Sequence, residues 1–335
     1  MADEWHPYNY IPSAWAAAVF AGLFGITTLA HTYQVYIKRT WYFIPLVLGG
    51  VFEVVGFIGR IFSRSNDLSA LAPFLIQAIF ILTAPTLFAA SIYIVLGRII
   101  LLVDGERYSW IRQRHLTWAF VMGDMMSLSL QSNGGGLTGG KSEFAINLGK
   151  IMIIAGLFAQ LAFFGLFIGV AGRFHYRLLN DKPVEKHVSF RWFHWLNRFR
   201  WRKASRPSSS TYATYNGPIA VNINELPWRR HIYVLYFSSV LVFVRSVFRV
   251  IEYIQGEDGY LLSNEMYLYV FDAVLMFVVM VMFNLIHPSQ LTDLYQARVD
   301  GARRAAADLE LQRTTESRAS EGHTPFLGSG GKGRG

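Results

Sequence analysis

Polar and ionisable side chains recur at helical spacing inside the most apolar parts of this sequence. Three sets follow the pattern: Glu53, Gly56 and Arg60; Asp124, Ser127 and Gln131; and Arg245, Arg249 and Glu252. Residues spaced by three or four and then seven positions share one face of a helix. An ionisable group in a membrane core costs at least ~2.5 kcal/mol on insertion scales, so such groups indicate functional sites.

Three further residues belong with these faces, namely Gln77, Gln160 and Asp272. The candidate substrate-binding residues are therefore Glu53, Arg60, Gln77, Asp124, Ser127, Gln131, Gln160, Arg245, Arg249, Glu252 and Asp272. The formal charges of this set sum to −1, and a spare carboxylate suits an ammonium group. The Gln and Ser side chains suit the hydroxyl groups of a polar headgroup.

A purely structural role is the alternative for these charges. Arg249 and Glu252 are an obvious pair within one helix, and Arg60 has Glu252 or Asp272 as expected partners. Buried ion pairs stabilise a fold poorly compared with apolar packing. We therefore favour a cavity that accepts a polar headgroup.

The elements that position these residues are apolar segments long enough to cross a membrane. Of 335 residues, 53% are hydrophobic and 16% charged, against roughly 25% charged in soluble domains. A spanning helix needs about 20 apolar residues. Seven blocks reach this length: 13–36, 41–62, 69–96, 116–137, 149–171, 231–254 and 265–287. The predicted fold is all-α, a seven-helix transmembrane bundle.

The distribution of basic residues orients this bundle. The net charge is +9, and 25 of the 31 Lys and Arg lie in the first, third and fifth loops and the C-terminal tail. Basic residues collect on cytoplasmic loops. The prediction is an N-terminus outside, a C-terminus in the cytosol, and polar faces that converge in the outer half of the bundle.

The expected domain organisation is an extracellular segment 1–12, a transmembrane domain 13–288 and a cytosolic tail 289–335 that is mostly disordered. Within the tail, 289–312 is a candidate amphipathic helix. The cytosolic loop 172–230 contains a basic, aromatic-rich stretch at 191–203, typical of a helix in the lipid interface. RNA binding by this stretch is the less favoured alternative, so no nucleic-acid partner is predicted.

Two nucleotide-binding patterns appear and are rejected. The pattern Gly135-x-x-x-x-Gly140-Lys141-Ser142 matches a phosphate loop, and Gly134-x-Gly136-x-x-Gly139 matches a dinucleotide loop. Both need a preceding β-strand, whereas here a membrane helix precedes the glycines. We interpret them as a turn joining the fourth and fifth spans. The chain has no cysteine and no catalytic motif, so we predict no enzyme activity, cofactor or metal.

The same polar faces carry a family resemblance. The motifs are Tyr10-x-Pro12, Glu53-x-x-Gly56-Phe57-x-x-Arg60, Ala84-Pro85 with Tyr93 and Gly97-Arg98, Asp124-x-x-Ser127-x-x-x-Gln131-x-x-Gly134-x-Gly136, Gly149 with Gly156-x-x-x-Gln160, Arg245-x-x-Phe248-Arg249-x-x-Glu252, and His287-Pro288. In this order and spacing, over about residues 8–290, the chain resembles the fungal lipid-translocating exporter family, also called RTA-like proteins. Phe57 and Phe248 stand where the family usually has Tyr.

The resemblance implies a seven-span, non-enzymatic membrane protein that moves sphingoid long-chain bases or other amphiphiles and gives resistance to toxic ones. Its partners would be membrane lipids and an amphiphilic substrate, and it would reside in the plasma membrane. No protein partner is identified. Two alternatives stay open: a seven-span receptor, and a stress-response membrane protein acting indirectly on lipid asymmetry. Against the receptor, Gly97-Arg98 follows the third span in place of an Asp/Glu-Arg-Tyr motif.

Overall fold

The computed structural model describes residues 13–65, 71–103, 105–109, 113–138, 142–182, 184, 228–256, 259–261 and 264–321. Within these ranges the regular structure is entirely helical. The long helices are α1 (Ala14–Lys38), α2 (Ile44–Ser65), α3 (Leu71–Leu102), α4 (Gln113–Thr138), α5 (Glu143–Leu179), α7 (Trp228–Gln255) and α10 (Ser289–Glu321). The shorter elements are η1 (Trp41–Phe43), η2 (Gly105–Tyr108), α8 (Glu265–Leu268), η6 (Tyr269–Val274) and α9 (Leu275–Leu285).

Each of the seven predicted apolar blocks lies on a helix or a continuous series of helices. The last block is the least regular, because α8, η6 and α9 follow one another directly and η6 is a π-helical turn. Such turns are rare and often occur at functional sites. Six of the seven segments are long and apolar enough to cross a membrane; α4, which carries several polar residues, falls short in apolar character.

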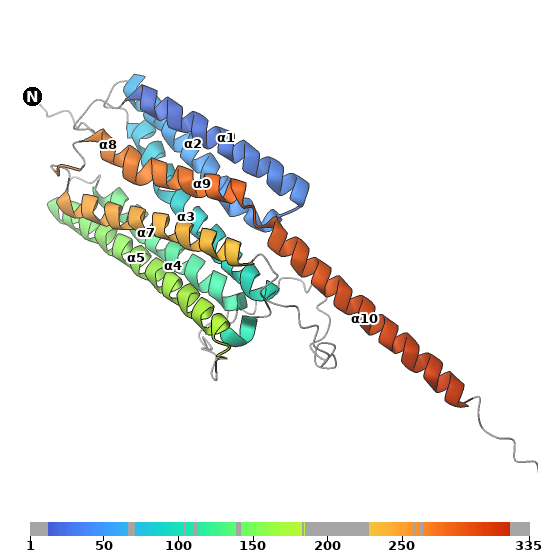
Figure 1. Ribbon diagram of the computed structural model, residues 1–335. Coiled ribbons are helices and arrows are strands. Elements are labelled where there is room, and N and C mark those ends of the chain that lie inside the picture. The colour runs from blue at the N-terminus through green and yellow to red at the C-terminus, as the bar shows by residue number, and fades with distance from the viewer. Residues whose placement is uncertain are drawn as a thin grey trace, which may run out of the picture. The chain divides into compact units, whose positions relative to one another are not determined.

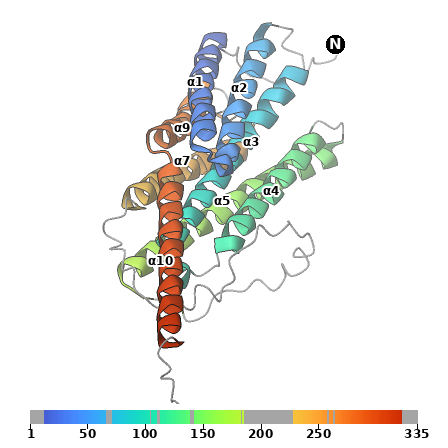
Figure 2. The ribbon, with the colours of Figure 1, turned by 90° about the vertical axis from the view of Figure 1, so that its right-hand side faces the viewer.

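The helices α1 to α5 and α7 to α9 belong to one compact unit and pack side by side (Figure 1). The strongest pairings join α4 with α5, α2 with α3, and α1 with α2. Figure 2 shows α4 and α5 running alongside each other. Of the membrane-span candidates, α3 has the largest buried share. It contacts α2, α4 and α7, and so lies at the centre of the bundle.

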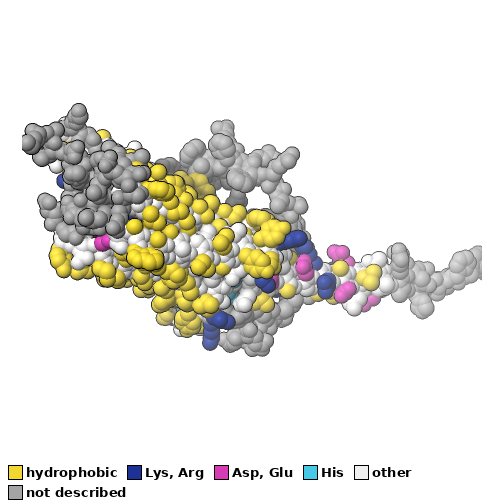
Figure 3. Space-filling view, turned by 90° about the horizontal axis from the view of Figure 1, so that it is seen from above, with side chains coloured by type: hydrophobic (Ala, Val, Ile, Leu, Met, Phe, Trp, Pro, Cys, Tyr) yellow, Lys and Arg dark blue, Asp and Glu magenta, His cyan; other side chains and the backbone are white. Residues whose placement is uncertain are grey.

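The exterior of this unit suits a lipid environment. Large apolar side chains are exposed along the helices, for example Ile26, Ile151 and Val240. Figure 3 shows hydrophobic side chains predominating on the visible face of the bundle. Since lipid tails are as apolar as these side chains, such a surface is stable in a membrane and would be a liability in water.

Of the glycines in the two rejected patterns, Gly134, Gly135 and Gly136 are helical, so the expected turn does not include them. Helix α4 continues to Thr138. A Cβ on Gly134 would lie 2.7 Å from the carbonyl oxygen of Gly149, and one on Gly149 would lie 2.6 Å from that of Gly134. These glycines therefore let the backbones of α4 and α5 approach closely, as small residues do between membrane helices.

Residues 292–321 of helix α10 lie in a second unit. The expected helix at 289–312 is present, and it is longer than predicted because it continues to Glu321. It carries the exposed ion pair Asp300–Arg303, at 3.7 Å. The predicted interfacial helix at 191–203 lies outside the described residues.

Candidate substrate-binding site

Arg245 of α7 joins three helices inside the bundle. Its Nε donates to Asp272 Oδ1 of η6, and its Nη2 donates to the carbonyl oxygen of Ile81 in α3 at 3.1 Å. Both charged side chains are almost fully buried. An arginine can satisfy such separate acceptors because its guanidinium carries five donors in a fixed geometry.

Glu53 of α2 faces this ion pair. A glycine one turn further along, Gly56, permits close packing, since a Cβ there would lie 2.5 Å from Ile81 Cγ1. Glu53 is only 1% exposed, its charged neighbours are Asp272 and Arg245, and neither carboxylate oxygen has a hydrogen-bond partner. A buried polar atom without a partner is rare in proteins and calls for an explanation.

Arg249 and Glu252 extend the same group along α7. Arg249 Nη1 lies 2.6 Å from Glu252 Oε2, which confirms the pair expected within this helix. Glu252 also has Asp272 and Arg245 as charged neighbours. We call Glu53, Arg245, Arg249, Glu252 and Asp272 the central charge cluster. It contains three carboxylates and two guanidinium groups.

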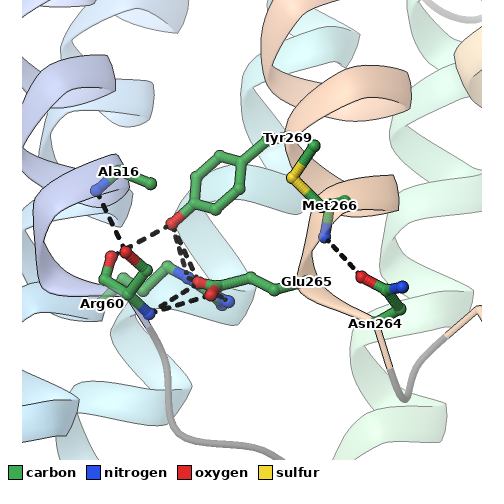
Figure 4. Close-up of polar contacts among 7 residues, drawn as sticks. Ala16, Arg60, Asn264, Glu265, Met266 and Tyr269 are labelled. Carbon is green, nitrogen blue, oxygen red and sulfur yellow. Dashed lines mark hydrogen bonds and ion pairs between the residues drawn. The ribbon is translucent and has the colours of Figure 1, made fainter.

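Arg60 makes a different contact from the one predicted. It pairs with Glu265 of α8, with Nη2 2.7 Å from Oε1, and not with Glu252 or Asp272. Its Nε lies 3.3 Å from the Tyr269 hydroxyl. Both Glu265 oxygens also accept the backbone N–H of Ser13, at 2.9 Å. Figure 4 shows the Arg60 guanidinium, the Glu265 carboxylate and the Tyr269 hydroxyl brought together by these contacts.

The polar residues of α4 have neutral partners on neighbouring helices. Tyr93 of α3 donates its hydroxyl to Asp124 Oδ2 at 2.7 Å. Gln131 Nε2 donates to Gln160 Oε1 of α5 at 3.0 Å. Ser127 donates to the Gly123 carbonyl within α4. Asp124 Oδ1 has no hydrogen-bond partner.

The eleven predicted site residues are therefore all inside the bundle, ten of them buried and Arg249 half-buried. Five of them form the central charge cluster, and Arg60 belongs to the Glu265 contact. Asp124, Ser127, Gln131 and Gln160 lie at the α4 contacts. Gln77 is buried in α3, where its backbone packs against Gly59 of α2.

Three partners were not among the predicted site residues, namely Glu265, Tyr269 and Tyr93, although Tyr93 belongs to the family motif. The spacing of Glu265 and Tyr269, four residues apart at the start of a span, was the available signal for the first two. Tyr93 offered no periodic signal, because it is one aromatic residue in a strongly apolar helix. Among the described residues, no group of three or more His, Asp or Glu side chains is placed to hold a metal ion.

Comparison with known proteins places these motifs in a family. The family model described as RTA1 like protein matches residues 46–294. The chain is 31% identical to Protein RTM1 of Saccharomyces cerevisiae, over 84% of this chain and 91% of that protein. It is 31% identical to Protoporphyrin uptake protein 1 of the same species, over 83% and 90%. It is 29% identical to Sphingoid long-chain base transporter RSB1, over 79% and 69%.

No solved structure matches the chain significantly. The family match covers five of the six candidate membrane spans and the central charge cluster, and the yeast relatives cover most of the sequence. The apolar helices and these relatives identify an integral, multi-pass membrane protein, and the chain belongs to the family of RTA1-like proteins.

Proposed function

We propose that this protein is a seven-span transporter of amphiphiles with a cationic headgroup, such as sphingoid long-chain bases, and that it acts in the plasma membrane. Two relatives are named for transport or uptake of amphiphilic molecules. The observation that carries the proposal is the Glu53 carboxylate, buried beside the Arg245–Asp272 pair with both oxygens unpaired.

The burial pattern of α4 supports a seventh span. Its 26 residues reach about 39 Å at 1.5 Å per residue, more than the ~30 Å hydrocarbon core. Its polar residues Asp124 and Gln131 are buried against α3 and α5, whereas Met122 and Met126 are exposed. Part of the low apolar character of α4 thus comes from side chains that face the bundle. Its exposed side chains include Met122 and Met126 and, nearer its C-terminal end, the polar Ser129, Ser132 and Asn133.

Seven spans and the distribution of basic residues together support an outside N-terminus and a cytosolic C-terminus. In this orientation Glu265 begins the last span at its outer end, and the central charge cluster lies deeper in the membrane. A headgroup entering from the outer side would meet the Arg60–Glu265 contact first.

Charge balance makes the central charge cluster suitable for an ammonium group. Arg245 pairs with Asp272 and Arg249 pairs with Glu252, so the Glu53 carboxylate is in excess. An ammonium group carries three N–H donors and one positive charge. It would satisfy the unpaired oxygens of Glu53 and the unpaired Oδ2 of Asp272. The alkyl tail would stay between helices or in lipid.

The α4 contacts supply hydrogen-bonding groups for the rest of a headgroup. Gln131 keeps Oε1 without a partner, and Asp124 keeps Oδ1 without one. Both are acceptors for the hydroxyl groups of a sphingoid base. These residues would select among cationic amphiphiles, whereas Glu53 would provide the charge.

The test uses purified protein in liposomes that contain a labelled sphingoid base, with transfer between leaflets as the readout. Replacing Glu53 by Gln removes the charge and keeps the shape of the side chain. We expect transfer to fall about tenfold or more, since a hydrogen bond to a charged group contributes ~1.5–3 kcal/mol. Glu310→Gln makes the same chemical change at an exposed position of α10 and should leave transfer unchanged.

Protein-free liposomes set the background rate, and the elution profile of each variant in detergent checks its folding. If wild-type protein transfers the base no faster than protein-free liposomes, direct transport is wrong and an indirect role in lipid asymmetry takes its place. If wild type is active and folded Glu53→Gln protein is equally active, the central charge cluster is not the substrate site.

A further inference from the structure

A surface hollow at the end of α5, away from the central charge cluster, has no role in the proposed transport path. Its volume is about 600 Å³. The residues that line it are Gly169, Gly172, Arg173, Tyr176, Arg177 and Lys182. In the proposed orientation, this end of α5 faces the cytosol.

The lining follows from helical spacing. Gly169, Gly172 and Tyr176 recur at intervals of three and four, so they lie on one face of α5. A Cβ on either glycine would meet nothing within 4 Å. Close helix packing therefore does not require these glycines, in contrast to Gly134 and Gly149. Their effect is to leave open space beside the helix backbone.

Basic side chains surround this open space. Arg173 and Lys182 are exposed and Arg177 is half-exposed. The backbone N–H of Lys182 donates to the Arg177 carbonyl at 3.1 Å, which turns the chain back at the end of the helix. Lys182 Nζ lies 5.9 Å from the centre of the Tyr176 ring. The neighbouring carboxylate, Asp181, accepts a hydrogen bond from the Tyr108 hydroxyl, so it is engaged on η2.

The surface of α5 that leads from the hollow toward the middle of the membrane is apolar. Leu166 precedes Gly169 by three residues and is 58% exposed, and Phe163 is also exposed. A positively charged rim beside an apolar helix face matches a phospholipid: the headgroup is anionic, and the tail extends into the membrane. Tyr176, 58% exposed, has the amphipathic ring typical of the membrane interface.

We propose that this hollow binds the headgroup of an anionic phospholipid of the cytosolic leaflet. Arg177 and Lys182 contact the phosphate, and the first part of an acyl chain lies along the glycine face of α5. Guanidinium groups bind phosphate oxygens in a bidentate manner, and the cytosolic leaflet is rich in anionic lipid. The proposal rests on the orientation given under Proposed function, but it does not depend on the substrate.

The test measures which lipid stays bound. Full-length protein is reconstituted in vesicles of phosphatidylcholine and phosphatidylserine, released gently, and analysed by native mass spectrometry for retained lipid. We expect wild-type protein to retain phosphatidylserine in preference to phosphatidylcholine. The double variant Arg177→Gln/Lys182→Gln should retain at least about fivefold less phosphatidylserine than wild type, because it removes two phosphate contacts.

A second variant tests the hollow without changing its charge. Gly169→Leu fills the space beside the helix, and we expect it to lower phosphatidylserine retention as well. The matched control is Arg303→Gln/Arg304→Gln, which removes two exposed basic residues of α10. It should retain phosphatidylserine like wild type. Glu53→Gln should do the same, which separates this site from the transport site.

Three results would overturn the proposal. Equal retention of phosphatidylcholine and phosphatidylserine by wild type would show no headgroup selectivity. Unchanged retention in both hollow variants would place the lipid elsewhere. Inorganic phosphate that displaces the lipid at millimolar concentration, or that binds equally well by itself, would identify a site for free anions.

Discussion

Arg60 of α2 and Glu265 of α8 form the contact that ties the start of the last span to the second helix. The guanidinium Nη2 lies 2.7 Å from Glu265 Oε1, and the Arg60 side chain is only 1% exposed. Glu265 also accepts the backbone N–H of Ser13, the residue that caps α1. One carboxylate thus holds the ends of three helices together, and it does so at the proposed outer entrance to the site.

Replacing Glu265 by Gln should destabilise the protein by about 3 kcal/mol. The buried guanidinium of Arg60 would lose its ion pair with Glu265, and breaking a buried pair on one side usually costs this much. Unfolding of purified protein in detergent, followed by circular dichroism against added denaturant, gives the free energy.

The double variant Arg60→Gln/Glu265→Gln serves as control for this contact. It removes both charges, so it should lose less stability than the sum of the two single variants. Additive losses would mean that the two side chains do not interact across the helices.

Gly134→Ala should lower the melting temperature, whereas Gly135→Ala should not. A Cβ at Gly134 would meet the Gly149 carbonyl oxygen at 2.7 Å, so α4 and α5 would have to separate. Overpacking of this kind costs typically ~1–3 kcal/mol. At Gly135 nothing lies within 4 Å, and alanine favours a helix more than glycine does. Thermal unfolding of the two purified variants makes the comparison, and equal melting temperatures would contradict it.

Tyr93→Phe should destabilise the bundle by about 1–3 kcal/mol, because Asp124 would lose its hydrogen-bond donor while remaining buried. Tyr233→Phe is the matched control, since Tyr233 is 63% exposed. Denaturant unfolding measures both. Adding Asp124→Leu to Tyr93→Phe should recover part of the loss, because the unpaired carboxyl group is then gone. A loss of the same size in Tyr233→Phe would show that the hydroxyl bond to Asp124 is not the cause.

The helix positions were predictable from apolar blocks, but the helix ends were not. A block shows where the chain meets hydrocarbon, and helices continue beyond it into the interface. Thus α5 covers Glu143–Leu179, although its apolar block covers only 149–171. A helix continues until a capping residue ends its hydrogen-bond pattern. The position of its end therefore depends on capping and not on hydropathy.

The sequence predicted which residues are buried in the site better than it predicted which of them form ion pairs. Spacing placed Glu53, Arg245 and Asp272 on inward faces, and all three are buried. The partner of Arg60 was predicted wrongly, because Glu265 and Asp272 are seven residues apart and share a face in a regular helix. Asp272 lies within the π-helical turn η6 and Glu265 lies before it; Asp272 contacts Arg245, whereas Glu265 contacts Arg60. Such a turn depends on tertiary contacts that spacing does not encode.

Two exposed positions flanking α4 test whether this helix crosses the membrane. Glu106, in η2, and Ser142, just before α5, lie on either side of this helix and are both exposed. If α4 crosses the membrane, a membrane-impermeant maleimide added to intact cells should label Ser142→Cys but not Glu106→Cys. Because the chain has no native cysteine, each variant reports a single position without background. Permeabilising the cells should expose Glu106→Cys to the reagent and so confirm that it is reactive. Labelling of both positions from outside would show that α4 does not cross, which leaves six spans. Labelling of Glu106→Cys alone would reverse the proposed orientation, and with it the assignment of the α5 hollow to the cytosolic leaflet.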